Sequence, residues 1–267
     1  MKAASFTSVM KTIGSKQDEK IRTVINSALN IINEEANQNA EARMSNALEV
    51  FSQAKSAHTE NMLKLNDINA AITRSEKERQ NALNESAKSE QNFRTRFREL
   101  RGMMTPELKA EHSQRVAGRE LAEDITVVIA ELEDDKTDVM LSACESGGKY
   151  VGAHSSALSV YARNEWATAM KDIPPALIRA FTLRLRELEM EGGESPHRVL
   201  IQELGENVLA QSRFYAFEMA HEPVISQIGL HRPALTGVDM KLYKSPAKRM
   251  LLAKELARKT QPQEVKP

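Results

Sequence analysis

The sequence predicts an all-α protein organised around an elongated antiparallel helical hairpin, a coiled-coil-like arm, with a smaller helical C-terminal domain. The stretch from Ser15 to Arg101 contains neither glycine nor proline, and its apolar residues recur at helical spacing. Aromatic residues make up only 4% of the chain. This composition favours seams between helices over large compact cores. We therefore expect residues 1–47 to form an N-terminal helical extension, 48–171 the arm, and 172–267 the C-terminal domain.

The first helix is expected to begin near Ser15, which forms a capping-box pattern with Asp18. A broad apolar stripe follows, made of Ile21, Val24, Ile25, Ala28, Leu29, Ile31 and Ile32. Residues 33–42 are then polar and include several weak helix formers. We expect the rod to bend there, or to separate into an N-terminal helix of its own.

A heptad seam continues along this helix. Its a/d positions are Leu48, Phe51, Lys55, His58, Met62, Leu65, Asn69, Ile72, Glu76, Arg79, Leu83, Ser86, Glu90, Phe93, Phe97 and Leu100. About half of them are polar, which would make a weak free parallel dimer. The seam therefore needs a partner made for it within the chain.

The next stretch supplies that partner. Thr105 suits an N-cap, Pro106 the first helical position and Glu107 the positive end of the helix dipole. The helix that follows has a seam of its own at Gly118, Leu121, Ile125, Val128, Leu132, Asp135, Val139 and Ser142. Two long helices with so short a connection lie antiparallel, and we expect a hairpin roughly 60 Å long.

Glycine and proline divide the rest of the chain. Gly147, Gly148 and Gly152 predict a kink or a close approach, and the second helix should end before Pro174. Further helices are expected at 176–191, from the cap Ser195-Pro196 to about 220, and from the cap Ser245-Pro246 to about 259. Residues 224–243 read as irregular but apolar, so they must be buried against the protein's own helices or another copy. The tail is expected to be disordered.

Catalytic and metal-binding patterns are missing from the sequence. There is no glycine-rich phosphate loop, no Cys/His metal spacing and no nucleophile elbow, so we expect neither an enzyme nor a cofactor. Cys144 reads as a small buried residue, and the six histidines as surface or seam residues. Charge is balanced at 37 basic and 37 acidic residues, which argues against nucleic-acid binding by the whole protein. No apolar run predicts a signal peptide or a membrane span.

Three surfaces could bind partners. One is the hairpin tip, where Arg94, Arg96, Arg98 and Arg101 gather beside two phenylalanines. Another is an apolar surface predicted for self-association, made of Ile228, Leu230, Leu235 and Tyr243. The last is a basic cluster: Lys241, Lys244, Lys248, Arg249, Lys254, Arg258 and Lys259. This cluster is either a solvated helix face or a docking site for an acidic partner, protein or nucleic acid.

Several passages, in order and spacing, resemble the Sid family, the capsid-size-determination or external scaffolding proteins of satellite phages. They are Ala54–Asn61 leading into Glu76–Glu78, Phe93–Arg98 to Thr105–Lys109, Gln114–Leu121, Ala143–Glu145, Ser159–Ala162, and Glu222–Val224 through Gly229-Leu230 to Ser245–Arg249. An N-terminal extension of about thirty residues precedes the match, and Lys171–Ala220 diverges.

The resemblance implies a non-enzymatic protein that acts in the host cytoplasm, on the outer surface of a procapsid. Such proteins join into a cage over the helper phage's major capsid protein and force a smaller icosahedral shell. The arms would grip the coat protein and make twofold contacts, and the C-terminal region threefold contacts. The passage Ile228–Lys259 also resembles the polarity suppression (Psu) family, which decorates capsids and inhibits the termination factor Rho. That is the alternative function.

Overall fold

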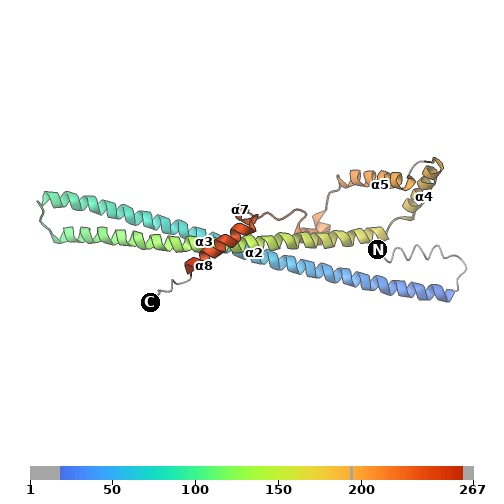
Figure 1. The fold of residues 1–267 in the computed structure, drawn as a ribbon, viewed down its shortest axis with the longest axis horizontal. Helices are drawn as coiled ribbons and strands as arrows, with labels where there is room; N and C mark the ends of the chain where they lie inside the picture. The colour runs from blue at the N-terminus through green and yellow to red at the C-terminus, as the bar shows by residue number, and fades with distance from the viewer. Residues whose placement is uncertain (1–18, 193–194, 261–267) are drawn as a thin grey trace. The chain divides into compact units, whose positions relative to one another are not determined.

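The computed structural model describes residues 19–192 and 195–260, and all regular elements in these ranges are helices (Figure 1). The two longest are α2 (Glu19–Glu99) and α3 (Pro106–Lys171). They are followed by α4 (Pro175–Met190), α5 (Pro196–Ser212), η1 (Met219–His221), α6 (Pro223–Ile228), α7 (Met240–Tyr243) and α8 (Pro246–Thr260). The all-α class with a long helical hairpin is confirmed. The expected capping box at Ser15 and the tail beyond residue 260 lie outside the described residues.

The chain divides into two units, one of residues 1–52 with 152–233 and one of residues 53–151 with 234–267. We call them the N-terminal unit and the hairpin unit. Both α2 and α3 contribute residues to each unit. The three consecutive domains expected from the sequence stay a prediction.

In the hairpin unit, α2 and α3 run antiparallel and are joined by a short turn (Figure 1). The α2 part of this hairpin, residues 53–99, is roughly 70 Å long at 1.5 Å per residue. The pairing is shown by hydrogen bonds from both ends of the hairpin. Asn61 Nδ2 donates to Ser146 Oγ at 3.0 Å, and Ser86 Oγ donates to the Arg115 carbonyl at 2.9 Å.

One of the two predicted seam positions in each heptad is confirmed. On α2 it recurs every seven residues, buried or half-buried, at Phe51, His58, Leu65, Ile72, Arg79, Ser86 and Phe93. On α3 it recurs at Gly118, Ile125, Leu132 and Val139.

The other predicted seam position is only partly confirmed. On α2, Met62, Asn69, Glu90 and Phe97 are half-buried as predicted, but at other positions on both helices a neighbouring residue is buried in place of the predicted one. On α2, Ala82 is buried in place of Leu83, which is 42% exposed. On α3, Ala122 is 3% exposed, whereas the predicted Leu121 is 53% exposed. A Cβ at Gly118 would lie 3.2 Å from the Ala82 carbonyl oxygen, so the backbones nearly touch. Where helices approach this closely, small side chains fill the seam and larger apolar neighbours face outward.

The expected hinge at residues 33–42 is wrong as a break in the helix, because α2 continues through it. Weak helix propensity is readily overridden by the packing of neighbouring turns. Residues 147–152 do not interrupt α3 either. The close approach expected at the glycines is confirmed at Gly147, where a Cβ would lie 3.2 Å from both methyl carbons of Leu235.

The C-terminal elements differ in detail from expectation. α5 ends at Ser212, before the predicted end near residue 220, and Ser195 makes no side-chain cap hydrogen bond. Pro223 starts α6 and does not close a helix. Proline is suited to this first helical position because no backbone donor is needed there. The segment 224–243, predicted to be irregular, therefore contains α6 and α7.

Candidate assembly surfaces

The hairpin tip is a tight turn held by backbone hydrogen bonds. The Gly102 amide donates to the Phe97 carbonyl at 2.9 Å, and the Met103 amide donates to the Leu100 carbonyl at 3.1 Å. Arg101 and Gly102 both have positive φ, 49° and 88°, which reverses the chain. On the far side, Thr105 Oγ1 accepts from the Leu108 amide at 3.4 Å, as expected of an N-cap.

The four tip arginines fall into two pairs. Arg94 Nη2 lies 2.6 Å from Glu90 Oε1, and Arg96 Nη1 lies 2.7 Å from Glu111 Oε1. Both ion pairs are within the hairpin. Arg98 and Arg101 are exposed and take part in no ion pair among the described residues. The repulsion expected between Arg94 and Arg98 is relieved because Glu90 draws Arg94 toward the preceding turn.

The turn also exposes sulfur-containing side chains. Met103 is 69% exposed and Met104 50% exposed. Beside the turn, Phe93 stacks on Phe97, with ring centroids 5.6 Å apart. The tip thus combines a rigid aromatic base with flexible methionines and two arginines whose charge is not met internally. Methionine adapts its shape to a partner, so this surface is suited to binding another protein.

The C-terminal segment of the hairpin unit packs on the middle of α3. Val238 is 7% exposed and forms a core with Ala143 and Cys144, and Leu235 and Tyr243 pack against that core. Gly147 provides the space that Leu235 occupies. Burial raises the pKa of the Cys144 thiol, which fits the expected inert apolar residue. Part of the predicted apolar surface is therefore packed within the chain.

Two short-range devices hold α7 and α8 in this position. The Asp239 carboxylate caps α7 by accepting from the amides of Lys241 and Leu242, at 2.8 and 3.1 Å. The Arg249 guanidinium donates to the carbonyls of Leu242 and Tyr243 at the end of α7. Cations at a helix C-terminus are favourable because the carbonyl ends carry partial negative charge.

The basic cluster finds one acidic partner within the hairpin unit itself. Lys259 Nζ on α8 lies 2.6 Å from Asp134 Oδ1 on α3. Because Arg249 also donates to carbonyls within the chain, two of the seven cations are used internally. Three of the remaining cations, Lys248, Lys254 and Arg258, lie on α8, which also carries Met250 and Leu251, 69% and 62% exposed.

The other two residues of the predicted self-association surface belong to the N-terminal unit. Ile228, on α6, is 5% exposed, and Leu230 is half-buried. This segment is anchored to α3 of the same unit by two polar contacts. His154 Nε2 lies 3.0 Å from the Gly229 carbonyl oxygen, and Tyr161 Oη donates to Glu222 Oε2 at 2.7 Å. Burial, with the hydrogen bond to Glu222, raises the pKa of Tyr161 to about 12.

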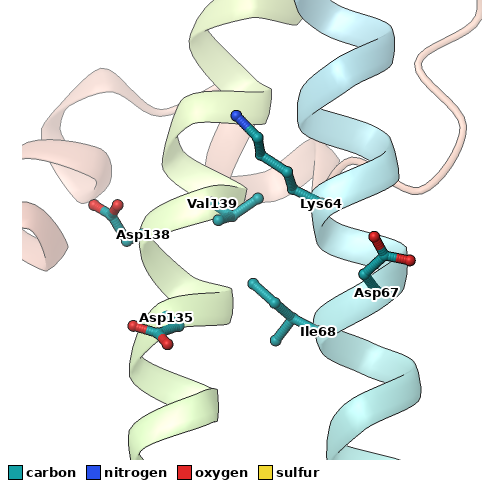
Figure 2. Close-up of a pocket in the computed structure, with 6 residues that line it drawn as sticks. All are labelled: Lys64, Asp67, Ile68, Asp135, Asp138 and Val139. Carbon is teal, nitrogen blue, oxygen red and sulfur yellow. The ribbon is translucent and has the colours of Figure 1, made fainter.

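An open hollow of about 370 Å³ lies on the hairpin between Lys64, Asp67 and Ile68 of α2 and Asp135, Asp138 and Val139 of α3. Figure 2 shows Ile68 and Val139 pointing toward one another between the helices. Among the described residues, no group of histidines, cysteines and carboxylates could hold a metal ion. No helix in the same ranges is long and apolar enough to cross a membrane.

Comparison with known proteins gives a consistent result. No protein-family model matches the chain. It is 28% identical over 214 residues to Glycoprotein 3 of Enterobacteria phage P4, an alignment that covers 76% of this chain and 86% of the relative. A solved structure described as the satellite phage P4 procapsid including size determination (Sid) protein matches with a TM-score of 0.69 and 25% identity. That match covers 80% of this chain and 94% of the other.

The chain is homologous to P4 Sid. The resemblance predicted from the sequence is confirmed, and Sid is described as part of a procapsid. The homology covers most of both chains, whereas the resemblance to Psu involved the C-terminal passage alone. Homology to a structural protein of a procapsid fits the absence of catalytic patterns.

Sequence reasoning missed two functional features. It did not find the exposed methionines at the tip, because adjacent methionines in a turn carry no periodic signal. It also could not assign the glycine pair of α3 as the place where Leu235 packs, because that contact joins residues 88 positions apart in the chain. The glycines predicted that some segment approaches α3 closely, but they did not indicate which segment it is.

Proposed function

We propose that this chain is an external scaffolding protein that assembles on the procapsid of a helper phage and directs formation of a smaller icosahedral shell. It performs no catalysis and acts in the host cytoplasm, on the outer surface of the shell. The observation that carries this proposal is the homology to P4 Sid over 86% of that protein's length, together with the matching fold.

The hairpin suits this role physically. A scaffold that imposes curvature must resist bending, and paired helices whose backbones nearly touch at Gly118 are stiffer than single helices. The polar seam also makes the pairing specific, because His58, Asn61 and Ser146 satisfy one another only in this register.

The hairpin tip is the coat-protein contact in this proposal. Arg98 and Arg101 present charges that no described residue meets, and Met103 and Met104 present adaptable apolar surface. Arg94 and Arg96 support the site from within the hairpin through Glu90 and Glu111. An acidic, partly apolar patch on the coat protein would complement this surface.

A self-association contact at Ile228, Leu230, Leu235 and Tyr243 stays a prediction. Ile228 and Leu230 belong to the N-terminal unit, and Leu235 and Tyr243 to the hairpin unit. All four are at least half-buried within the chain, so a second copy would contact the surface that each leaves exposed. Such a contact would be weak alone, since association costs an estimated 4–15 kcal/mol of rigid-body entropy. A closed cage repeats the contact many times, which makes weak contacts sufficient.

Co-expression tests the function directly. The chain is expressed with the major capsid proteins of candidate helper phages, and particle diameters are measured by electron microscopy. We expect one coat protein to form small shells only when the chain is present. The matched control is the chain with Leu230→Asp, which should restore large shells while circular dichroism stays unchanged. Normal shells with every coat protein tested would contradict the proposal.

A further inference from the structure

The last turns of α3 expose the single tryptophan of the chain. Trp166 is 65% exposed, and Met170, one turn further along the same helix, is 44% exposed. Two residues before Trp166, Asn164 Nδ2 donates to the Ala40 carbonyl of α2 at 3.4 Å. Residues two apart on an α-helix are about 200° apart around its axis. Trp166 therefore lies on the side of α3 that faces away from α2, and α2 does not cover it.

A second group of exposed aromatic rings follows in the chain. We call residues 196–218 the strap; it consists of α5 and the linker between α5 and η1. Phe214, in this linker, is 88% exposed, and its neighbours Tyr215 and Phe217 are 64% and 43% exposed. The rings of Tyr215 and Phe217 pack edge to face, with centroids 5.1 Å apart. The ring that stays most open to water in this linker is thus that of Phe214.

Both ends of the strap are tied to the last part of α3. Just beyond its C-terminal end, Glu222 Oε2 accepts from Tyr161 Oη at 2.7 Å. Tyr161 precedes Trp166 by five residues, which is about 7.5 Å along the helix. Near its N-terminal end, Glu203 Oε1 lies 2.7 Å from Arg184 Nη2 of α4, and α4 begins only four residues after α3 ends.

These ties keep Phe214 close to Trp166. Eight residues separate Phe214 from Glu222, and a fully extended chain of that length spans at most about 28 Å. Groups joined by a short linker meet at an effective concentration on the order of millimolar, far above the concentration of a second copy in dilute solution. The strap is therefore the partner that Trp166 encounters first. Because both rings are exposed in the structure, it shows the strap open.

We propose that the strap closes onto the end of α3, with the Phe214 ring packed against Trp166 and Met170. The three residues between α3 and α4, 172–174, act as the hinge. Aromatic rings pair favourably in offset or edge-to-face arrangements, and methionine sulfur packs well against ring edges. Closure removes from water an apolar patch that α2 leaves bare. The contact lies within one chain and needs no coat protein, so its tests are independent of the proposed function.

The single tryptophan makes closure directly measurable. The emission spectrum of the full chain and its quenching by acrylamide are recorded over a dilution series. We expect the emission of an indole shielded from water, with weak quenching at every concentration. Phe214→Asp should shift the emission to longer wavelength and strengthen the quenching. The matched control is Met190→Asp, which changes an apolar residue of α4 that is 82% exposed and lies outside the strap, and it should change neither.

Three results would overturn the proposal. An indole that is open to water in the free chain, including one shielded only after a coat protein is added, would mean that the strap does not close. Shielding that is lost on dilution would mean that a second copy covers Trp166. Shielding that survives Phe214→Asp would mean that another segment covers it. Circular dichroism is recorded for both variants, and since Phe214 and Met190 are exposed we expect the helices to be retained.

A crosslinking experiment tests the same contact without fluorescence, in a Cys144→Ser background. Trp166→Cys combined with Phe214→Cys should be joined within one chain by a short bismaleimide, because closure brings these positions together. The control combines Trp166→Cys with Met190→Cys, since Met190 lies at the far end of α4, about 22 Å from its start. Peptide mapping identifies the linked positions, and the mass of the product separates links within a chain from links between chains. No link within the chain for the first pair, or equal yields for both pairs, would contradict closure.

Discussion

Single glycines decide where the C-terminal segment can pack. Gly147 is buried beneath Leu235, whereas Gly152, on the same helix, has no atom within 4 Å of an added Cβ. Any side chain at position 147 must displace Leu235, and with it the packing of Val238 on Cys144. Leu235 can therefore pack on α3 only because position 147 has no side chain.

We expect Gly147→Leu to release the segment from Ala234 to the end of α8, while Gly152→Leu leaves it in place. Both substitutions gain similar helix propensity, about 1 kcal/mol relative to glycine, so the difference between them reports the contact alone. Limited proteolysis and amide exchange across residues 234–260 measure the result. Equal protection in the two variants would mean that the packing of Leu235 does not depend on Gly147.

His58 makes the hairpin sensitive to acid. Its side chain is 6% exposed, Nδ1 lies 3.2 Å from Ser146 Oγ, and the ring stacks on Tyr150 with centroids 5.8 Å apart. Burial lowers the pKa of His58 from its ordinary value of 6.5, although a backbone hydrogen bond involving Ala143 opposes this shift. The folded state therefore holds the neutral ring, and the unfolded state takes up a proton first as the pH falls.

His58 therefore makes the folded state less stable as the pH falls. The stabilisation from neutral His58 is fully present above pH 6.5 and is lost progressively as the pH falls below it, toward the lower folded pKa. Denaturant unfolding at about pH 7 and about pH 5 measures this. We expect His58→Gln to be less stable than the natural chain at the higher pH, and the gap to shrink at the lower one. A gap that is constant with pH would show that His58 does not titrate between the two states.

At the scale of elements, the seam of the hairpin shows what periodicity can and cannot predict. Heptad spacing located Phe51, His58 and Leu65 correctly because the strict recurrence of seven is visible in one sequence. It misplaced the second position by choosing Leu121 over Ala122. The prediction assumed that the larger apolar side chain is the buried one. Where the two backbones approach closely, however, only small side chains fit between them. The distance between two helices cannot be deduced from the periodicity of either one alone.

Filling the space at Gly118 should lower the free energy of unfolding by a measurable amount. Gly118→Leu would place its side chain against the Ala82 carbonyl and Ser86 Cβ, both 3.2 Å from the added Cβ. Because backbone cannot move aside as a flexible side chain can, we expect a loss of roughly 1–3 kcal/mol in the free energy of unfolding. Ala117→Leu, on the neighbouring exposed position, should change it little. The two are compared by urea denaturation.

The turn element gives a prediction about shell formation. Reversing the charge of the exposed tip arginine with Arg98→Glu should reduce the fraction of small shells, with helicity unchanged. The matched control is Arg74→Glu, at an exposed position of the same helix far from the tip. Particle size in co-expression with the coat protein is the measurement. Equal loss in both variants would indicate a general charge effect, and no loss in either would remove the tip as the contact.

For the whole molecule, the sequence predicted the all-α class and the hairpin, because long glycine-free stretches and helix caps are local signals, and it predicted the resemblance to P4 Sid from ordered passages. Among the C-terminal elements it placed α4, the start of α5 and α8 to within about one residue, but it missed α6 and α7. Pro223 illustrates why the others were missed. A proline can either end one helix or start the next, and here it starts α6, which buries Ile225 and Ile228. The tip arginines were found as a group, but only the positions of Glu90 and Glu111 separate the two paired ones from the two that remain available.

Because the seam residues of α2 recur every seven positions, the length of the hairpin can change only in steps of one heptad if the pairing is to be kept. Deleting residues 73–79 together with 124–130 removes one heptad from each helix at facing positions, so every remaining seam residue keeps its partner. The tip should then move about 10 Å closer to the packed C-terminal segment, without rotation. Spin labels at Met103 and Lys248 would measure that step. Deleting two residues from each helix should instead rotate the remaining seam positions by about 200° and disrupt the pairing of the helices. The length of such an arm could therefore change in evolution or by design by whole heptads, and not by smaller numbers of residues.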